Sequence, residues 1–230
     1  GYGRMGREIE KCAIKKGHKI SLKINSKNIC DLNTKNISNI DVAIEFSTPK
    51  YAFNNILFCL NNKTPIVSGT TGWLKKMPEV KKLCKQKNGA FLYAPNFSIG
   101  VNIFFEINNY ISRLMKNKNY NIYIEEKHHA LKKDTPSGTA IKIMNDIYKN
   151  TYGELMKTHL NDSDKIPIKS KRIGNLKGEH IIKYVSDIEE IKISHKSYNR
   201  RGFAEGAILA AEFLKNNKGF FTMKSVINNL

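Results

Sequence analysis

Short apolar strands alternate with amphipathic helices over residues 1–97, and this alternation restricts the fold more than any other feature of the chain. Strands are predicted at 18–25, 41–46, 65–68 and 90–94. Helices are predicted directly after the opening glycines and again at about 49–61 and 77–86. Parallel strands need crossovers of this kind. We therefore expect an α/β fold with a Rossmann-like, doubly wound parallel sheet that helices cover on both faces.

From residue 98 the pattern changes to longer strands with fewer helices between them. The elements expected there are helices at 101–115 and about 136–149, and strands at 120–126, 166–173, 180–186 and 191–196. Such an order favours an α+β domain with an open mixed or antiparallel sheet. A last amphipathic helix is expected at 203–214. The chain is thus predicted to comprise a dinucleotide-binding domain, 1–97 with 201–230, and a domain for substrate and oligomerisation, 98–200.

Bulk composition restricts the partners. The net charge of +19 comes from lysines spread along the whole chain, with no aromatic-basic motif, so we expect no specific nucleic-acid partner. Because no apolar run approaches about 20 residues, and no secretory signal is seen, we expect no membrane span and a cytoplasmic protein. The cysteines are scattered, which predicts free thiols and no metal site: Cys12, Cys30, Cys59 and Cys84.

The opening glycines have the spacing of a phosphate-binding turn. Gly1, Gly3 and Gly6 form GxGxxG, with Arg4 and Met5 before the third glycine and a helix directly after. Glycine lets the backbone approach a pyrophosphate, and the helix N-terminus offers it free N–H groups. A strand ordinarily precedes this turn, and none precedes Gly1, so we expect a few residues of the domain to lie outside this sequence.

The end of the second predicted strand bears on the choice of cofactor. A carboxylate there would hold the ribose 2′-hydroxyl and repel a 2′-phosphate. Asn25 and Lys27 occupy this region instead. We therefore expect NADPH or NADH as the cofactor, with NADPH at least tolerated.

A polar run over residues 125–140 carries the most chemical information. His128 and His129 close a predicted strand, Lys132 follows, and a Ser-Gly-Thr sequence starts a helix. Cations and free N–H groups bind carboxylates, and a histidine can deliver a proton at neutral pH. Residue chemistry alone equally allows a strand end followed by a solvated lysine turn. Glu125 and Glu126 are not expected to bind a metal, because no third ligand has a suitable spacing.

The run Glu-x-His-His-x-x-Lys-x-Asp-x-Pro-Ser-Gly-Thr-Ala, residues 126–140, resembles the signature of the dihydrodipicolinate reductase family. Other blocks follow in the family's order: 3–6, 69–72, 94–102, 178–180, His195-Lys196, Arg200 and Phe203. The resemblance implies NAD(P)H-dependent reduction of a small dicarboxylate, 4-hydroxy-tetrahydrodipicolinate, in lysine and diaminopimelate biosynthesis. It also implies a homotetramer built through the sheets of the second domain.

The resemblance further implies roles for single residues. It makes His128 the proton donor and Lys132 the catalytic lysine. The implied substrate contacts are His129, Ser137, Gly138, Thr139 and Thr71. The implied cofactor contacts, together with the glycine turn and Asn25, are Gly1, Gly3, Arg4, Met5, Gly6, Gly69, Thr70, Thr71, Ala94, Pro95, Asn96, Phe97, Arg200 and Phe203.

Two other functions stay open. One is a related reductase with another acidic substrate, such as aspartate dehydrogenase, against which the double histidine and the Pro-Ser-Gly-Thr helix start argue. The other is a non-catalytic dinucleotide sensor or a basic nucleic-acid binder. Of the remaining histidines, His18, His159, His180 and His195 are expected to be surface or structural residues.

Overall fold

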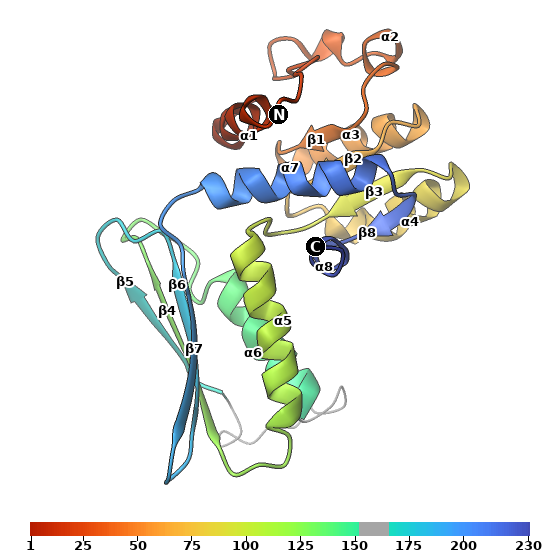
Figure 1. Ribbon diagram of the computed structural model, residues 1–230. Helices are drawn as coiled ribbons and strands as arrows, with labels where there is room; N and C mark the ends of the chain where they lie inside the picture. Colours follow the sequence, from red (N-terminus) through yellow and green to blue (C-terminus); the bar gives the residue numbers. More distant parts are fainter. Residues whose placement is uncertain (152–165) are drawn as a thin grey trace. The chain divides into compact units, whose positions relative to one another are not determined.

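The chain forms two compact units, and the computed structural model describes residues 1–151 and 166–230 of it (Figure 1). Unit 1 comprises Gly1–Asn102 with Arg201–Leu230, and unit 2 comprises Ile103–Arg200. These limits lie within a few residues of the predicted domain boundaries. His159 lies outside the described residues.

Unit 1 is built on a four-stranded parallel sheet in the order β1-β2-β3-β8. Its strands are β1 (Ala43–Glu45), β2 (Ile66–Ser68), β3 (Ala90–Tyr93) and β8 (Gly219–Phe221). Its longer helices are α1 (Arg4–Lys15), α3 (Pro49–Asn61), α4 (Met77–Gln86) and α7 (Arg201–Lys215). Three short helical segments and a last helix complete it: η1 (Ile29–Asp31), α2 (Thr34–Ile37), η2 (Leu74–Lys76) and α8 (Met223–Ile227).

Helices cover both faces of this sheet because successive side chains of a strand point to opposite sides. Val67 and Leu92 pack in one core with residues of α1 and α7. Ile66 and Phe91 pack in a second core with residues of α3 and α4. All four side chains are at most 1% exposed. The predicted doubly wound parallel sheet is therefore confirmed.

Two predictions for this unit were wrong or incomplete. Residues 18–25 form no strand, although their apolar residues alternate. A strand needs a hydrogen-bonded neighbour, and none of the described residues pairs with this segment. The predictions also missed β8, which pairs with β3 through Phe91 and Phe220. Its three residues are too few to show a period.

Unit 2 contains a mixed sheet in the order β5-β4-β6-β7. Its strands are β4 (Asn121–His128), β5 (Ile168–Arg172), β6 (Glu179–Val185) and β7 (Glu190–Lys196). β4 pairs with β5 in parallel, whereas the β4–β6 and β6–β7 pairs are antiparallel. The predicted mixed sheet is confirmed.

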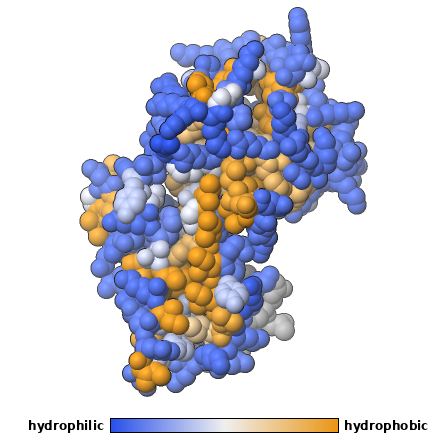
Figure 2. All heavy atoms as spheres, viewed as in Figure 1, coloured by the Kyte–Doolittle hydropathy of each residue, from blue (hydrophilic) through white to orange (hydrophobic). Residues whose placement is uncertain are grey.

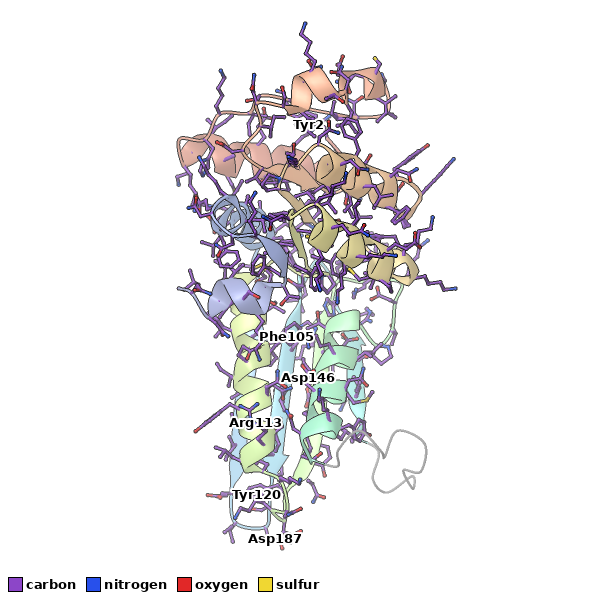
Figure 3. The ribbon with its side chains drawn as sticks, turned by 90° about the vertical axis from the view of Figure 1, so that its right-hand side faces the viewer. Tyr2, Phe105, Arg113, Tyr120, Asp146 and Asp187 are labelled. Atoms are coloured by element: carbon purple, nitrogen blue, oxygen red, sulfur yellow. The ribbon has the colours of Figure 1, made fainter. Side chains whose placement is uncertain are left out.

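Two helices run side by side in unit 2: α6 (Gly138–Thr151) and α5 (Ile99–Leu114), of which unit 2 holds the part from Ile103 onward (Figures 1 and 3). Lys142 of α6 holds its ammonium 4.9 Å from the ring centre of Phe105 on α5, and it also pairs with Asp146. No helix among the described residues is long and apolar enough to cross a bilayer.

The strand period of β4 sorts its side chains between two environments. Ile124, Glu126 and His128 are buried, whereas Tyr123 is 42% exposed. A glutamate and a histidine therefore share the buried face of one strand. This placement creates the polar site of unit 2.

Candidate active site

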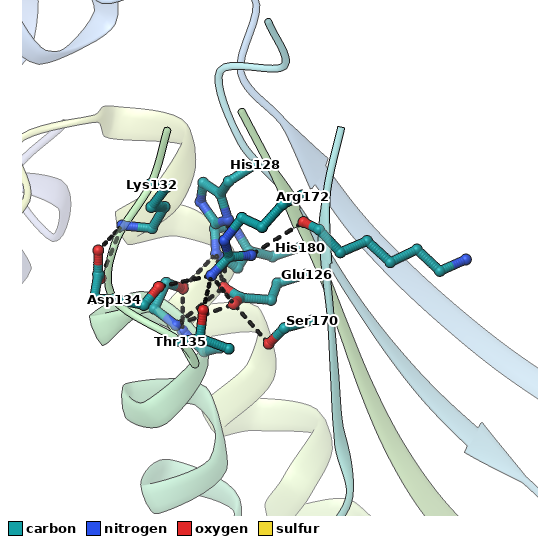
Figure 4. Close-up of polar contacts among 11 residues, drawn as sticks. Glu126, His128, Lys132, Asp134, Thr135, Ser170, Arg172 and His180 are labelled. Atoms are coloured by element: carbon teal, nitrogen blue, oxygen red, sulfur yellow. Dashed lines mark hydrogen bonds and ion pairs between the residues drawn. The ribbon is translucent and has the colours of Figure 1, made fainter. Parts of the chain in front are cut away.

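A fully buried carboxylate, that of Glu126, lies at the centre of the polar site in unit 2 (Figure 4). Its oxygens accept hydrogen bonds from the backbone N–H of Ser137 at 3.1 and 3.2 Å. Oε1 also accepts from Oγ of Ser170 at 2.8 Å and from Nη2 of Arg172 at 3.1 Å. Burial raises the pKa of Glu126, but the hydrogen bonds from Ser137, Ser170 and Arg172 lower it by more, so this pKa lies below that of an ordinary glutamate.

Arg172, at the end of β5, connects this carboxylate to the loop that precedes α6. Its Nη2 donates to the carbonyl of Asp134 at 2.6 Å and to Oγ1 of Thr135 at 2.8 Å (Figure 4). A planar guanidinium suits such multiple contacts. The loop is therefore fixed to the sheet.

Two imidazoles face the same carboxylate. Nδ1 of His128 lies 3.4 Å from Oε2 of Glu126, at ion-pair distance, and it makes no hydrogen bond within the described part of the chain. Nε2 of His180, on β6, lies 3.9 Å from the same oxygen and 3.2 Å from Oγ of Ser137. The ring centres of the two histidines are 5.0 Å apart.

Burial lowers the pKa of both imidazoles and so favours their neutral forms. Burial and, to a lesser degree, the nearby His128 together lower the pKa of His180 to about 4. Burial also lowers the pKa of His128, whereas Glu126 raises it and Lys132 lowers it. The charge of His128 thus depends on the groups around it.

Backbone contacts also fix the position of His128. Its carbonyl accepts from the N–H of Ile173 at 2.7 Å. Gly178, with φ of 151°, comes so near that a Cβ there would lie 3.2 Å from Nε2 of His128. A larger residue at this position would push against the imidazole.

The start of α6 supplies a place for an anion. Ser137 caps the helix, because its Oγ accepts from the N–H of Ala140 at 3.2 Å. The first N–H groups of a helix have no partner within the helix and carry partial positive charge. A Cβ at Gly138 would meet no protein atom within 4 Å, so the space beside this helix start is open. The N–H groups of Gly138 and Thr139 can therefore bind a carboxylate.

The predicted lysine lies at this site with a partner of its own. The ammonium of Lys132 pairs with Asp134 at 2.7 and 2.8 Å, and it lowers the pKa of that carboxyl. The backbone N–H of Lys132 donates to the carbonyl of His129, which closes a turn. His129 itself is half-buried. An incoming dianion can compete with Asp134, which is 57% exposed, for the lysine.

The sequence reasoning gave no role in this site to four residues: Glu126, Ser170, Arg172 and His180. It expected no metal at Glu125 or Glu126, because no third ligand has a suitable spacing along the chain; the fold nevertheless brings possible ligand atoms of Glu126, His128 and His180 within 4.8 Å of one another. Arg172 already supplies the positive charge that such a carboxylate needs. The available signal was the strand period, which places Glu126 and His128 on one face.

The glycine turn of unit 1 is tightly packed at two of its glycines and open at the third. A Cβ on Gly6 would lie 2.5 Å from the carbonyl oxygen of Gly1, and one on Gly1 would lie 2.3 Å from that of Phe46. A Cβ on Gly3 would meet no protein atom within 4 Å. Two glycines thus permit close packing, while Gly3, followed by Arg4 and Met5 at the start of α1, faces open space.

The carboxyl ends of β1, β2 and β3 bring the other predicted cofactor segments together. The N–H of Gly69 donates to the carbonyl of Glu45 at 2.9 Å, and that of Ala94 donates to the carbonyl of Ser68 at 3.2 Å. The rings of Phe46 and Phe97 are 5.4 Å apart. Ligands of open α/β sheets bind at this edge.

A buried carboxylate also organises this edge. Glu45 is 3% exposed and accepts from Ser68 at 2.6 Å, from Thr70 at 3.0 Å and from Ser47. The hydrogen bonds from Ser68 and Thr70 to Glu45 therefore fix the start of the loop after β2. Thr71, the next residue, is exposed.

The remaining predicted cofactor contacts lie in other segments of the chain. Pro95 is exposed, and the side chain of Asn96 accepts from the N–H of Ser98. Asn25 is exposed in a local turn in which its Oδ1 accepts from the N–H of Lys27. Arg200 is exposed at the end of unit 2, and Phe203 is half-buried on α7 of unit 1.

Comparisons with known proteins cover the whole chain. Residues 1–97 match the family described as "Dihydrodipicolinate reductase, N-terminus", and residues 100–227 match "Dihydrodipicolinate reductase, C-terminus". A 4-hydroxy-tetrahydrodipicolinate reductase of Christiangramia forsetii is 44% identical over 100% of this chain and 96% of its own length. One from Wigglesworthia glossinidia brevipalpis is 40% identical over 85% of this chain and 71% of its own length.

A solved structure shares the fold. It is the dipicolinate-bound dihydrodipicolinate reductase of Paenisporosarcina sp. TG-14, with a TM-score of 0.81. The match covers 97% of this chain and 95% of that one at 23% identity. The arrangement of elements in this chain is thus that of a known reductase.

Proposed function

The chain belongs to the dihydrodipicolinate reductase family, and we propose that it reduces 4-hydroxy-tetrahydrodipicolinate to tetrahydrodipicolinate with NADPH or NADH. The reaction is a step of lysine and diaminopimelate biosynthesis. One observation carries the proposal: a chain that matches the family over its whole length holds the signature histidine beside a buried carboxylate and an open helix start.

The residues of unit 1 fit a nicotinamide dinucleotide. The open space at Gly3 and the start of α1 suit a diphosphate, and the segments at Gly69 and Ala94 lie at the sheet edge that binds such ligands. When bound, the reduced nicotinamide supplies the hydride. We assign Thr70, Thr71 and the 94–97 segment to its nicotinamide end, and Asn25, Arg200 and Phe203 to further cofactor contacts.

The residues of unit 2 bind the substrate in this proposal. The substrate carries two carboxylates, and the free N–H groups of Gly138 and Thr139 can receive one of them. Lys132 and His129 add donors beside them, with Lys132 exchanging Asp134 for a substrate carboxylate. The hydroxyl of Ser137 is occupied as the helix cap and its N–H by Glu126, so we expect this residue to serve the substrate by fixing the start of α6.

His128 delivers the proton in this proposal. Loss of the 4-hydroxyl as water leaves an unsaturated cyclic imine, and reduction at its C4 moves electron density toward the ring nitrogen. A proton must then reach the ring. A positioned imidazole can supply it, and general acid help of this kind is worth about 10² to 10⁴ in rate. Lys132 binds the carboxylate and assists.

A coupled assay tests the function. The substrate is formed from aspartate semialdehyde and pyruvate by the preceding synthase, and oxidation of NADPH or NADH is followed by absorbance. We expect His128→Gln to lower kcat by about 10² to 10⁴ with a smaller change in KM. Lys132→Ala should damage both constants, whereas Lys133→Ala, which removes the neighbouring exposed lysine, should damage neither. Full activity of the His128→Gln variant would contradict the assignment.

We also propose a homotetramer assembled through the sheets of unit 2, with α5 contributing an exposed face. An apolar stripe on α5 supports this: Ile103, Ile107, Tyr110 and Leu114 follow helical spacing and are 41–58% exposed. Figure 2 shows hydrophobic residues gathered along α5 on this face. Light scattering after size exclusion should give four chains per particle, and Ile107→Asp should reduce that number. A monomeric wild-type protein would overturn the proposal.

A cytoplasmic location completes the proposal. The four cysteines are free in the structure, and three of them are buried. Free thiols suit a reducing compartment. Fractionation of the producing cells should recover the protein with cytoplasmic markers, and recovery in another fraction would contradict this location.

A further inference from the structure

We propose that Glu126 is a positioning residue that holds the proton-carrying form of His128 against the start of α6. The inference rests on the proposed role of His128 as proton donor. It concerns a residue to which the sequence reasoning gave no role.

The carboxylate is held too firmly to rearrange freely. It is 0% exposed, and its three donors come from two segments: Ser137 lies directly before α6, and Ser170 and Arg172 lie on β5. All three donors reach Oε1. Oε2, which takes only the longer Ser137 contact, is the oxygen that lies 3.4 Å from Nδ1 of His128. The site therefore directs a fixed negative charge at an imidazole nitrogen that has no hydrogen-bond partner among the residues that the structure describes.

The charges around His128 show why this carboxylate matters. The charged groups that act on His128 are Glu126 and Asp134, which favour its protonated form, and Lys132 and Arg172, which oppose it; His180, at 5.0 Å, is the neighbouring imidazole. Asp134 is 57% exposed and already paired with Lys132. Glu126 is thus the buried carboxylate that offsets burial and two cations. Without its charge, the imidazole would lose its proton more easily, and a smaller fraction of it would be in the acid form near neutral pH.

The same carboxylate also fixes the distance between His128 and the start of α6. It accepts the N–H of Ser137, the residue directly before the N–H groups that we assign to the substrate carboxylate. One rigid group therefore touches both the proton donor and the anchor of the substrate-binding helix. Small displacements of reacting groups can reduce rates about 10²-fold, so a shared anchor has a direct catalytic effect.

The test compares Glu126→Gln with wild type by two measurements. NMR titration of the His128 ring in the full chain measures its protonation without turnover, and the pH profile of kcat measures its use. We expect the titration of His128 to move to lower pH in Glu126→Gln. We also expect kcat to fall on the order of tenfold or more at pH 8, and less at pH 6, because the acid form persists longer at low pH.

A matched control separates this effect from loss of any carboxylate on the sheet. Glu179→Gln makes the same chemical change on the neighbouring strand, where Glu179 pairs with Lys127 on the opposite face. It should leave the His128 titration in place. If Glu126→Gln does not fold, Arg172→Gln keeps the inference testable. Removing this cation should move the His128 titration to higher pH.

The outcomes distinguish this inference from the proposed function. If His128→Gln is inactive but Glu126→Gln titrates and turns over as wild type does at every pH, Glu126 has no positioning role and the function stands. If Glu126→Gln loses stability with an unmoved His128 titration, its role is structural only. If His128→Gln keeps full activity, the proton-donor assignment itself fails.

Discussion

Replacing single glycines of the phosphate-binding turn should separate cofactor binding from folding. At Gly3 a new methyl group meets no protein atom within 4 Å, and the backbone, with φ −92° and ψ −152°, accepts alanine. Alanine is a poorer N-cap than glycine but restricts the unfolded chain, and these opposing effects are each about 0.5–1 kcal/mol. Gly3→Ala should therefore change stability very little.

The same methyl group stands where a diphosphate must approach the backbone. Loss of one charge-assisted hydrogen bond is worth about 1.5–3 kcal/mol, so Kd for the reduced cofactor should rise about 10- to 150-fold. Titration by cofactor fluorescence measures this change directly, without substrate. An unchanged Kd would show that the turn does not bind the diphosphate.

Gly6→Ala is the matched comparison. Its methyl group would lie 2.5 Å from the carbonyl oxygen of Gly1, so helix and turn must separate by about half an ångström. Overpacking of this kind costs about 1–3 kcal/mol, and each kcal/mol lowers Tm by about 2–4 °C in a chain of this size. Equal losses of Tm in both variants would refute the reasoning.

Three further predictions follow from the site residues. Ser137→Ala removes a helix cap and the hydrogen-bond partner of buried His180. It should lower the free energy of unfolding, measured by urea titration, by about 2 kcal/mol. A loss below about 0.5 kcal/mol would show that Ser137 does not stabilise the helix start as a cap. Because burial lowers the pKa of His180 to about 4, the unfolded chain takes up a proton below about pH 6.5 that the folded chain does not. Stability should therefore fall from pH 6.5 to pH 4, and less steeply in His180→Gln, by urea midpoints at each pH. Wild type should use NADPH at least as well as NADH, and Asn25→Asp should shift the ratio of kcat/KM toward NADH by about tenfold; a strong NADH preference in wild type would oppose this account of Asn25.

Periodic segments were predicted well because burial imposes their period directly. The helix at α7 and the strands β4, β6 and β7 lie within a few residues of their predicted limits. The segment 18–25 shows the limit of this reasoning. Its alternation was read correctly, but alternation describes which side chains could be buried, whereas a strand also needs a neighbour to hydrogen-bond with.

The sequence by itself determined the two kinds of sheet, the glycine turn and the family signature, since each is a local pattern of residue types. Only the tertiary structure decided that Arg172, 46 residues after Glu126, and His180, on another strand, meet the same carboxylate. Strand order and register, which no local pattern records, bring these side chains together. The charge on His128 depends on that meeting, because a buried imidazole responds to the groups within a few ångströms of it and not to its neighbours along the chain.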